Sequence, residues 1–295
     1  MFKNLMIYRL ASGWPTTLEA LDSALQAAKF TPCGASQEKS VGWVPPRGHA
    51  HGAFVEVVGG QWIMKLRIET KVLPASVVKR KVAEMVEKID VTEGRKVGSK
   101  ERKELAEEAR LSLLPRAFTK VKDVQVWVDT IRHLICTDAG STAIAEEVMT
   151  LIVKATDGLV VAPLTTQTSP AAAMAHWLAT KEAPLGFTVD RECELKAHDE
   201  SKSVVRYSRH ALDTNEVVGY VDGGLQPTRV ALTWRARVSF VLTDGLQLKK
   251  IEFWDSVFID GQPDKEDKFD ADVALFTGEM RDLLVDLFDA LGGEK

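Results

Sequence analysis

The stretch from Lys79 to Phe118 constrains the fold of this chain more than any other segment. It is rich in charged residues of both signs and holds few large apolar side chains before its end. The apolar residues in and just before its first half recur at the spacing of an amphipathic helix: Val78, Val82, Met85, Val86 and Ile89. We therefore expect a helix whose apolar stripe is too narrow to lie deep in a core.

A second helix should follow within the same stretch. Gly94 and Gly98 interrupt the first pattern, Ser99 is a suitable N-cap, and Pro115 limits how far the second helix can extend. Two helices with thin apolar stripes predict an antiparallel helical pair that projects from the body. The pair ends in a predicted apolar patch: Leu113, Leu114 and Phe118. A solvated surface hairpin with no further role explains the same pattern.

The rest of the chain mixes helices with hairpins. Residues 53–58 and 61–70 are β-rich runs separated by Gly59-Gly60, which predicts a tight hairpin. Residues 272–291 have the pattern of a strongly amphipathic helix. Because helices are interspersed with hairpins and do not alternate strictly with single strands, the fold class should be α+β, with antiparallel sheets and flanking helices. We divide it into a central region (1–73 and 119–165), the projecting tip (74–118) and a base (166–295).

The net charge of −4 argues weakly against a nucleic-acid partner, since most domains that bind nucleic acids are basic. Much of the basic charge nevertheless lies in the projecting pair and in residues 196–209, while acid gathers near the C-terminus. Phosphate responds to a local field, so DNA remains a possible partner. No apolar run is long enough to span a bilayer, and the N-terminus lacks a signal-peptide cleavage site. We expect a cytoplasmic protein without membrane contact.

Little in the sequence predicts catalysis. His49 and His51 form a weak metal-binding pattern without a neighbouring carboxylate or thiolate. No segment brings together a nucleophile, a base and an orienting group. We therefore expect no enzymatic activity, no cofactor and no metal. The alternative is a metal-dependent enzyme acting on DNA, whose cation would be held by a late acidic cluster: Asp255, Asp260, Asp264, Glu266, Asp267, Asp270 and Asp272.

A basic segment in the base region is the best candidate for contact with phosphate. Residues 204–212 alternate as a strand, which would place Arg206 and His210 on one side and Tyr207 and Arg209 on the other. Together with Lys202, such a strand could hold a DNA backbone. An edge strand protected by charged residues explains the same pattern equally well. The residues alone leave this choice open.

Several segments resemble one bacterial family in similar order and spacing. They are FKNLMIYRL at residues 2–10, FTPCG at 30–34, GWVPP at 42–46, SLLPRAF at 112–118, FDADVALFTGEM at 269–280 and DALGGE at 289–294. This combination resembles the recombination-associated protein RdgC family over essentially the whole chain. The combination is far more specific than any single motif.

The resemblance implies a DNA-binding protein without catalytic activity. Members of this family pair at both ends into a ring-shaped homodimer whose basic central hole accommodates double-stranded DNA, with little sequence preference; single-stranded DNA would bind more weakly. By occupying DNA, the family restrains the RecA recombinase and associates with the nucleoid. Such a ring also accommodates the acidic net charge, because positive charge needs to line only the hole.

The resemblance also suggests roles for a few residues. Phe118 falls on the family aromatic at the tip contact, where two projecting pairs meet, and Leu113 and Leu114 would join that contact. Arg209 and His210 align with a Lys-Gln pair that the family places at the hole. Arg209 keeps the positive charge, whereas histidine is largely neutral at pH 7. For the second dimer contact, at the opposite end, we expect the C-terminal helix or its neighbouring sheet.

Overall fold

The computed structural model describes residues 2–11, 14, 16–257 and 268–295. The twelve strands of these residues form one continuous sheet in the order β2-β4-β5-β6-β1-β12-β11-β10-β8-β9, with β3 on β4 and β7 on β1. All neighbouring strands of this sheet pair antiparallel. The predicted antiparallel pairing and α+β composition are confirmed. The expectation of several sheets is wrong, because β1 pairs with β12 and joins the two halves.

The N-terminal half contributes the strands from β1 to β7 and four of the helices. Its elements are β1 (Asn4–Leu10), α1 (Leu18–Ala27), β2 (Lys39–Val44), β3 (Glu56–Val58), β4 (Gln61–Val72), α2 (Ala75–Glu93), α3 (Ser99–Leu113), the 3-10 turn η1 (Leu114–Arg116), β5 (Phe118–Asp129), β6 (Leu134–Thr137), α4 (Thr142–Ala155) and β7 (Val161–Pro163). The predicted hairpin is present: Val58 pairs with Gln61, and both intervening glycines have positive φ.

The C-terminal half adds the remaining strands and three helices. Its elements are α5 (Pro170–Thr180), β8 (Phe187–Lys196), β9 (Val204–Ser208), α6 (Asn215–Asp222), β10 (Gln226–Trp234), β11 (Val238–Thr243), β12 (Gln247–Phe253), the 3-10 turn η2 (Asp255–Val257) and α7 (Lys268–Ala290). The predicted late amphipathic helix is therefore confirmed as α7.

Helices cover opposite faces of the sheet in its two halves. In the N-terminal core, α1 and α4 pack on one face through residues such as Leu25 and Val148. In the C-terminal core, residues of α5, α6 and α7 pack with the other face. Because side chains alternate along a strand, β8, β9, β10 and β12 turn their second set of side chains away from the C-terminal core.

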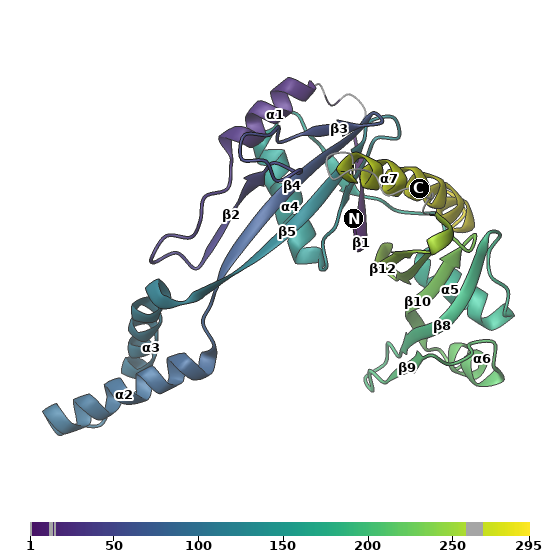
Figure 1. Ribbon diagram of the computed structural model, residues 1–295. Coiled ribbons are helices and arrows are strands. Elements are labelled where there is room, and N and C mark those ends of the chain that lie inside the picture. The colour runs from purple at the N-terminus through teal and green to yellow at the C-terminus, as the bar shows by residue number, and fades with distance from the viewer. Residues whose placement is uncertain (1, 12–13, 15, 258–267) are drawn as a thin grey trace.

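The elements follow an arc (Figure 1). The long β4–β5 ribbon leads to α2 and α3 at one end of the arc, and β9 and α6 lie at the other end. The N-terminal core lies between the two ends, and α7 runs from it toward the C-terminal half, so the projecting helices and the C-terminal strands are far apart in one subunit.

Helix α7 is fixed to the central part of the arc by aromatic and ionic contacts. Phe276 stacks on Phe2, with ring centroids 4.6 Å apart, and meets Trp127 edge-on at 6.0 Å. On the same helix, Arg281 Nε lies 2.9 Å from the carboxylate of the buried Asp129, at the end of β5. These contacts join the last helix to strands of the N-terminal half.

Two of the segments that carry the family resemblance, at residues 30–34 and 42–46, pack against each other. The backbone N–H of Phe30, in FTPCG, donates to the carbonyl of Trp43, in GWVPP, at 2.8 Å. A Cβ on the neighbouring Gly42 would lie only 2.4 Å from the Cα of Phe30. The backbones approach so closely here that only glycine fits.

The segment 74–118 differs from expectation in its details. Helices α2 and α3 form where the spacing predicted them and contact each other. The predicted N-cap is wrong by one residue: Gly98 occupies that position and Ser99 is the first helical residue. The predicted apolar patch is not continuous, because Leu114 is only 2% exposed while Phe118 is 87% exposed. Phe118 begins β5 opposite Val72, at the root of the helices rather than at their free end.

Candidate nucleic-acid interface

The outward face of the C-terminal strands carries a row of charged side chains. Arg229 on β10 lies directly opposite Glu194 on β8, and Glu194 lies directly opposite Arg206 on β9. Directly opposed residues on neighbouring strands point to the same side of a sheet. Their neighbours Cys193 and Val230 point into the C-terminal core, so the charged row faces away from it.

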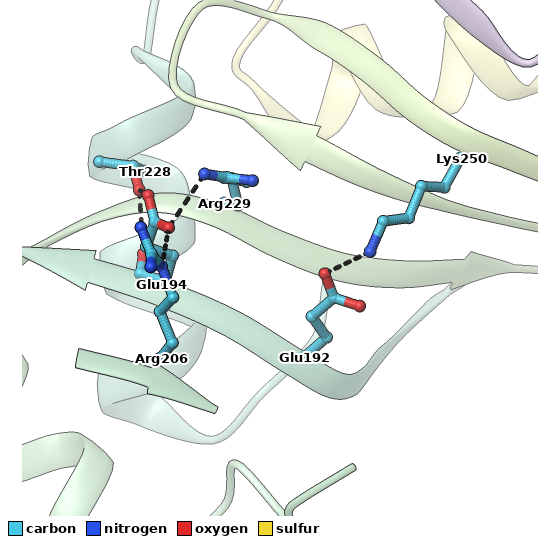
Figure 2. Close-up of polar contacts among 6 residues, drawn as sticks. All are labelled: Glu192, Glu194, Arg206, Thr228, Arg229 and Lys250. Carbon is cyan, nitrogen blue, oxygen red and sulfur yellow. Dashed lines mark hydrogen bonds and ion pairs between the residues drawn. The ribbon is translucent and has the colours of Figure 1, made fainter. Parts of the chain in front are cut away.

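Glu194 holds both arginines of this row (Figure 2). Its Oε2 accepts from Arg206 Nε at 2.5 Å and from Arg229 at 2.9 Å, and its Oε1 accepts from the Thr228 hydroxyl at 2.8 Å. Burial alone would raise the pKa of Glu194, but the hydrogen bonds from Arg206 and Thr228 and the charge of Arg229 lower it to about 2. The carboxylate is therefore ionised at neutral pH.

A second ion pair lies on the same face. Lys250 of β12 donates from Nζ to Glu192 Oε1 on β8 at 2.6 Å (Figure 2). The Lys250 side chain is exposed and Glu192 is half-exposed. The outward face thus presents the cations Arg206, Arg229 and Lys250 above two carboxylates.

The predicted basic strand is shorter than expected. Strand β9 ends at Ser208, so Arg209 and His210 lie in a bend beyond it and the predicted alternation across residues 204–212 is wrong at its end. Arg209 has φ of 57°, a left-handed conformation that ends the extended chain, and its side chain is exposed. The backbone N–H of His210 still donates to the Arg191 carbonyl at 3.2 Å, which ties the bend to β8.

The predicted phosphate-binding residues nevertheless share one hairpin. Lys202 lies in the turn between β8 and β9, Arg206 lies on β9, and Arg209 and His210 follow it, all exposed. The His210 ring packs at 5.2 Å from the ring of Tyr207, and its Nδ1 contacts the Ala211 carbonyl. Sequence reasoning missed Arg229, Lys250 and both glutamates. The alternation of residues 226–234 could have indicated that Arg229 faces outward, but not which charges lie beside it.

Comparison with known proteins identifies the family. A family model described as "Putative exonuclease, RdgC" matches residues 1–294. A protein of Dechloromonas aromatica named "Recombination-associated protein RdgC" is 43% identical, over 99% of this chain and 98% of the relative. A protein of Bordetella pertussis with the same name is 40% identical over 100% of this chain and 99% of the relative. The chain belongs to the RdgC family.

Family membership confirms the resemblance drawn from the motifs and connects the chain with DNA recombination. The two kinds of description differ on chemistry. The family model names an exonuclease, whereas the curated relatives have a name that mentions no reaction. The exposed cations of the β8–β9 hairpin and of the outward face are side chains of the types that contact phosphate in protein–DNA complexes.

The acidic cluster bears on the enzymatic alternative. Asp260, Asp264, Glu266 and Asp267 lie outside the described residues. Of the others, Asp270 is paired with Arg47 at 2.6 Å. Within the described part of the chain, which includes His49 and His51, no group of three or more His, Cys, Asp or Glu residues could hold a metal ion.

The three described cysteines are free thiols. Burial raises the pKa of the Cys136 thiol far above its ordinary value and that of Cys193 to about 11. Both are therefore protonated core residues at neutral pH.

No helix among residues 2–11, 14, 16–257 and 268–295 is long and apolar enough to cross a membrane.

Proposed function

We propose that this RdgC-family chain is a cytoplasmic, nucleoid-associated protein that binds double-stranded DNA without sequence preference, encircles it as a ring-shaped homodimer, and restrains RecA-dependent recombination. The observation that carries the proposal is the group of exposed cations on the β8–β9 hairpin and the adjoining outward face, in a chain of a recombination-associated family. Arginine and lysine side chains on such a surface suit phosphate, which every DNA sequence offers alike.

The arc supports the ring. Two arcs related by a twofold axis can close if each end meets its symmetry mate, which requires one self-complementary contact at each end. A frame around a duplex roughly 20 Å wide needs sides of that length, and a helix of about 15 residues spans about 22 Å. Helix α3 has 15 residues and lies at one end of the arc.

Phe118 is the residue proposed to form the first contact. It is 87% exposed, and its cross-strand neighbour Val72 is also exposed, so the two form an apolar spot at the root of α2 and α3. Leu113 is half-buried and can border this contact, whereas Leu114 supports it from inside its own subunit. Exposed apolar clusters of this kind mark contact sites.

The second contact is proposed at the C-terminal half. Leu185 and Val285 are both exposed, and the Gly186 that follows Leu185 lies close to Asp286 of α7. An apolar surface formed by α7 and the loop before β8 would complete the ring.

One assay tests DNA binding and its lack of sequence preference. Fluorescence anisotropy with labelled duplexes should give similar affinity for scrambled sequences, weaker binding to single strands, and a steep fall in affinity with salt. Each phosphate contact contributes about 0.9 to the slope of log affinity against log salt. Tight preference for one duplex, or a shallow slope, would contradict the proposal.

Two further experiments test the ring and its consequence. Analytical ultracentrifugation should give a dimer, and the dimer should be retained on relaxed circular DNA at salt concentrations that release it from linear DNA of equal length. RecA-catalysed strand exchange should slow as the duplex becomes covered. A stable monomer, or equal retention on circles and linear DNA, would exclude encirclement.

The family description favours a second candidate, an exonuclease. Incubation with labelled duplex and Mg²⁺ or Mn²⁺ tests it directly. Release of nucleotides that is lost when Asp264 and Asp267 are changed to Asn would establish a metal-dependent enzyme that uses the acidic cluster. Intact DNA at protein concentrations that saturate binding would support the non-catalytic role.

A further inference from the structure

The outward face of the C-terminal strands holds a carboxylate between two arginines. Arg206 and Arg229 converge on the single oxygen Oε2 of Glu194 at 2.5 and 2.9 Å (Figure 2). Two guanidinium groups around one anionic oxygen is also an arrangement in which arginines bind phosphate. The carboxylate therefore occupies the donors that a phosphate oxygen would use.

We propose that Glu194 is a built-in competitor of DNA phosphate, which occupies Arg206 and Arg229 in the free protein and thereby lowers DNA affinity. The inference rests on the proposed DNA-binding function and adds a residue that regulates it. Without this acidic residue, both arginines would be fully available to DNA phosphate.

The position of Glu194 is fixed, which distinguishes it from a passing surface contact. Its Oε1 is held by the Thr228 hydroxyl at 2.8 Å, and its side chain is only 13% exposed. The Arg206 side chain, in contrast, is 70% exposed. The hydrogen bond from Thr228 and the burial hold the carboxylate in place, whereas the exposed arginine has room to turn toward solvent. Phosphate must then draw Arg206 away from Glu194, against the pull of a fixed negative charge.

The net charge of this row of side chains depends on Glu194. Arg206, Arg229 and Glu194 together carry two positive charges and one negative charge at pH 7, because the pKa of Glu194 lies near 2. Replacing the carboxylate by a neutral amide doubles the net positive charge of this row without removing a donor. A protein that binds every sequence must also leave DNA, and a resident anion keeps its affinity moderate.

Glu192 provides a graded comparison on the same face. It engages one cation, Lys250, at 2.6 Å, and its side chain is more exposed than that of Glu194. Exposed ion pairs are screened by water and salt. Glu192→Gln should therefore act in the same direction as Glu194→Gln but less strongly.

Glu279 on α7 is the matched control. Its side chain is 15% exposed and paired with Arg237, so Glu279→Gln makes the same chemical change in a similar setting. It lies on a helix that packs against the opposite face of the sheet, and the substitution raises the net charge of the whole protein equally. Any difference between the two variants is therefore local to the outward face.

The test measures duplex affinity by anisotropy across a salt series for wild type, E194Q, E192Q, E279Q, R206A and the double variant E194Q/R206A. We expect E194Q to bind about three- to tenfold more tightly at low salt, with a slope steeper by about one. E279Q should match wild type. The gain should shrink in the R206A background, because the released arginine is then missing.

Separate outcomes identify which proposal fails. If wild type binds DNA but E194Q binds equally or more weakly, with an unchanged melting temperature, Glu194 positions the arginines or does nothing, and the competitor role is overturned. An equal gain in E279Q would reduce the effect to net charge and overturn it too. If neither wild type nor E194Q binds any DNA at low salt, the proposed function fails with it.

Discussion

Helices α2 and α7 have the same apolar period but very different surroundings. Helix α7 spans 23 residues and buries seven of them against the sheet, whereas α2 spans 19 residues and buries none. A helical period therefore predicts the helix but not its burial. The difference divides the molecule into a region that stabilises the fold and outlying regions, the β4–β5 ribbon with α2 and α3 and the β8–β9 hairpin, that are free to contact other molecules.

Truncation of a core aromatic side chain should cause the largest loss of folding stability. It tests whether α7 belongs to the region that stabilises the fold. Phe276 is 1% exposed and its ring contacts those of Phe2, Trp127 and Phe253. Phe276→Ala should lower the free energy of unfolding by about 3–5 kcal/mol, from lost burial and a cavity. Urea denaturation followed by circular dichroism measures it. A loss below about 1 kcal/mol would mean that α7 does not fix the arc.

Leu114 tests where the outlying region begins. Although it adjoins α3, it is 2% exposed, and its carbonyl accepts from Lys71 Nζ of β4 at 2.8 Å. Leu114→Ala should cost about 2–3 kcal/mol of unfolding free energy, because a buried leucine is truncated. A change in unfolding free energy within about 0.5 kcal/mol would mean that Leu114 is exposed, as the apolar patch predicted from the sequence requires.

The contrast explains what could be predicted from the sequence. Periodicity located α2, α3 and α7, and Gly59-Gly60 located the β3–β4 hairpin. Each of these depends on residues close together in the chain. The single sheet depends on the β1–β12 pairing, which joins Asn4 with Lys249 and therefore leaves no local signal in the sequence.

The candidate site, too, could be predicted only where its residues are close together in the sequence. The hairpin that contains Lys202, Arg206 and Arg209 is local, and its basic character could be predicted from the sequence. Its partner Arg229 reaches Glu194 through a strand pairing whose register shifts just before Arg229 and again just after Val230. A shift of one residue would turn Arg229 into the core, so the row of charges could not be derived without the register.

Arg209 tests the second outlying region, where we expect an effect on DNA and not on folding. Arg209→Ala should weaken binding to all duplexes severalfold and lower the salt slope by about one, because one phosphate contact is lost. His210→Ala should matter less, since the His210 ring packs beside Tyr207 and its Nδ1 already contacts the Ala211 carbonyl. Salt-dependent anisotropy compares the two variants. A larger loss for His210→Ala would show that the two roles are reversed.

Loss of the Glu194 ion pairs in acid should have a smaller effect on the stability of the folded protein. The pKa of Glu194 is lowered to about 2, below the ordinary value of 4.5, so the ionised form stabilises the folded state. That stabilisation is complete above about pH 4.5 and is lost as the pH falls toward 2. Glu194→Gln should thus flatten the acid limb of the melting temperature between pH 4.5 and 2. An unchanged acid limb would mean that the ion pairs contribute nothing to folding.

Phe118→Ala should have the smallest effect on stability and completes the comparison with Phe276. Both are phenylalanines, but Phe118 is 87% exposed and loses little contact within its subunit. Its truncation should change the unfolding free energy by less than about 0.5 kcal/mol. Burial against a symmetry mate could contribute roughly 1.5–3 kcal/mol per side chain, enough to hold a small contact closed and still let it open.

The functional effect of Phe118→Ala should appear on closed DNA. The dimer should persist through its second contact, while retention on circular DNA falls, because an open ring dissociates without reaching a DNA end. Leu111→Ala is the control, since Leu111 is an exposed apolar residue of α3 in the same region. Equal losses for both variants would point to a general apolar surface. A large drop in melting temperature with retention unchanged would show instead that Phe118 supports its own subunit, and the two phenylalanines would then differ only in degree.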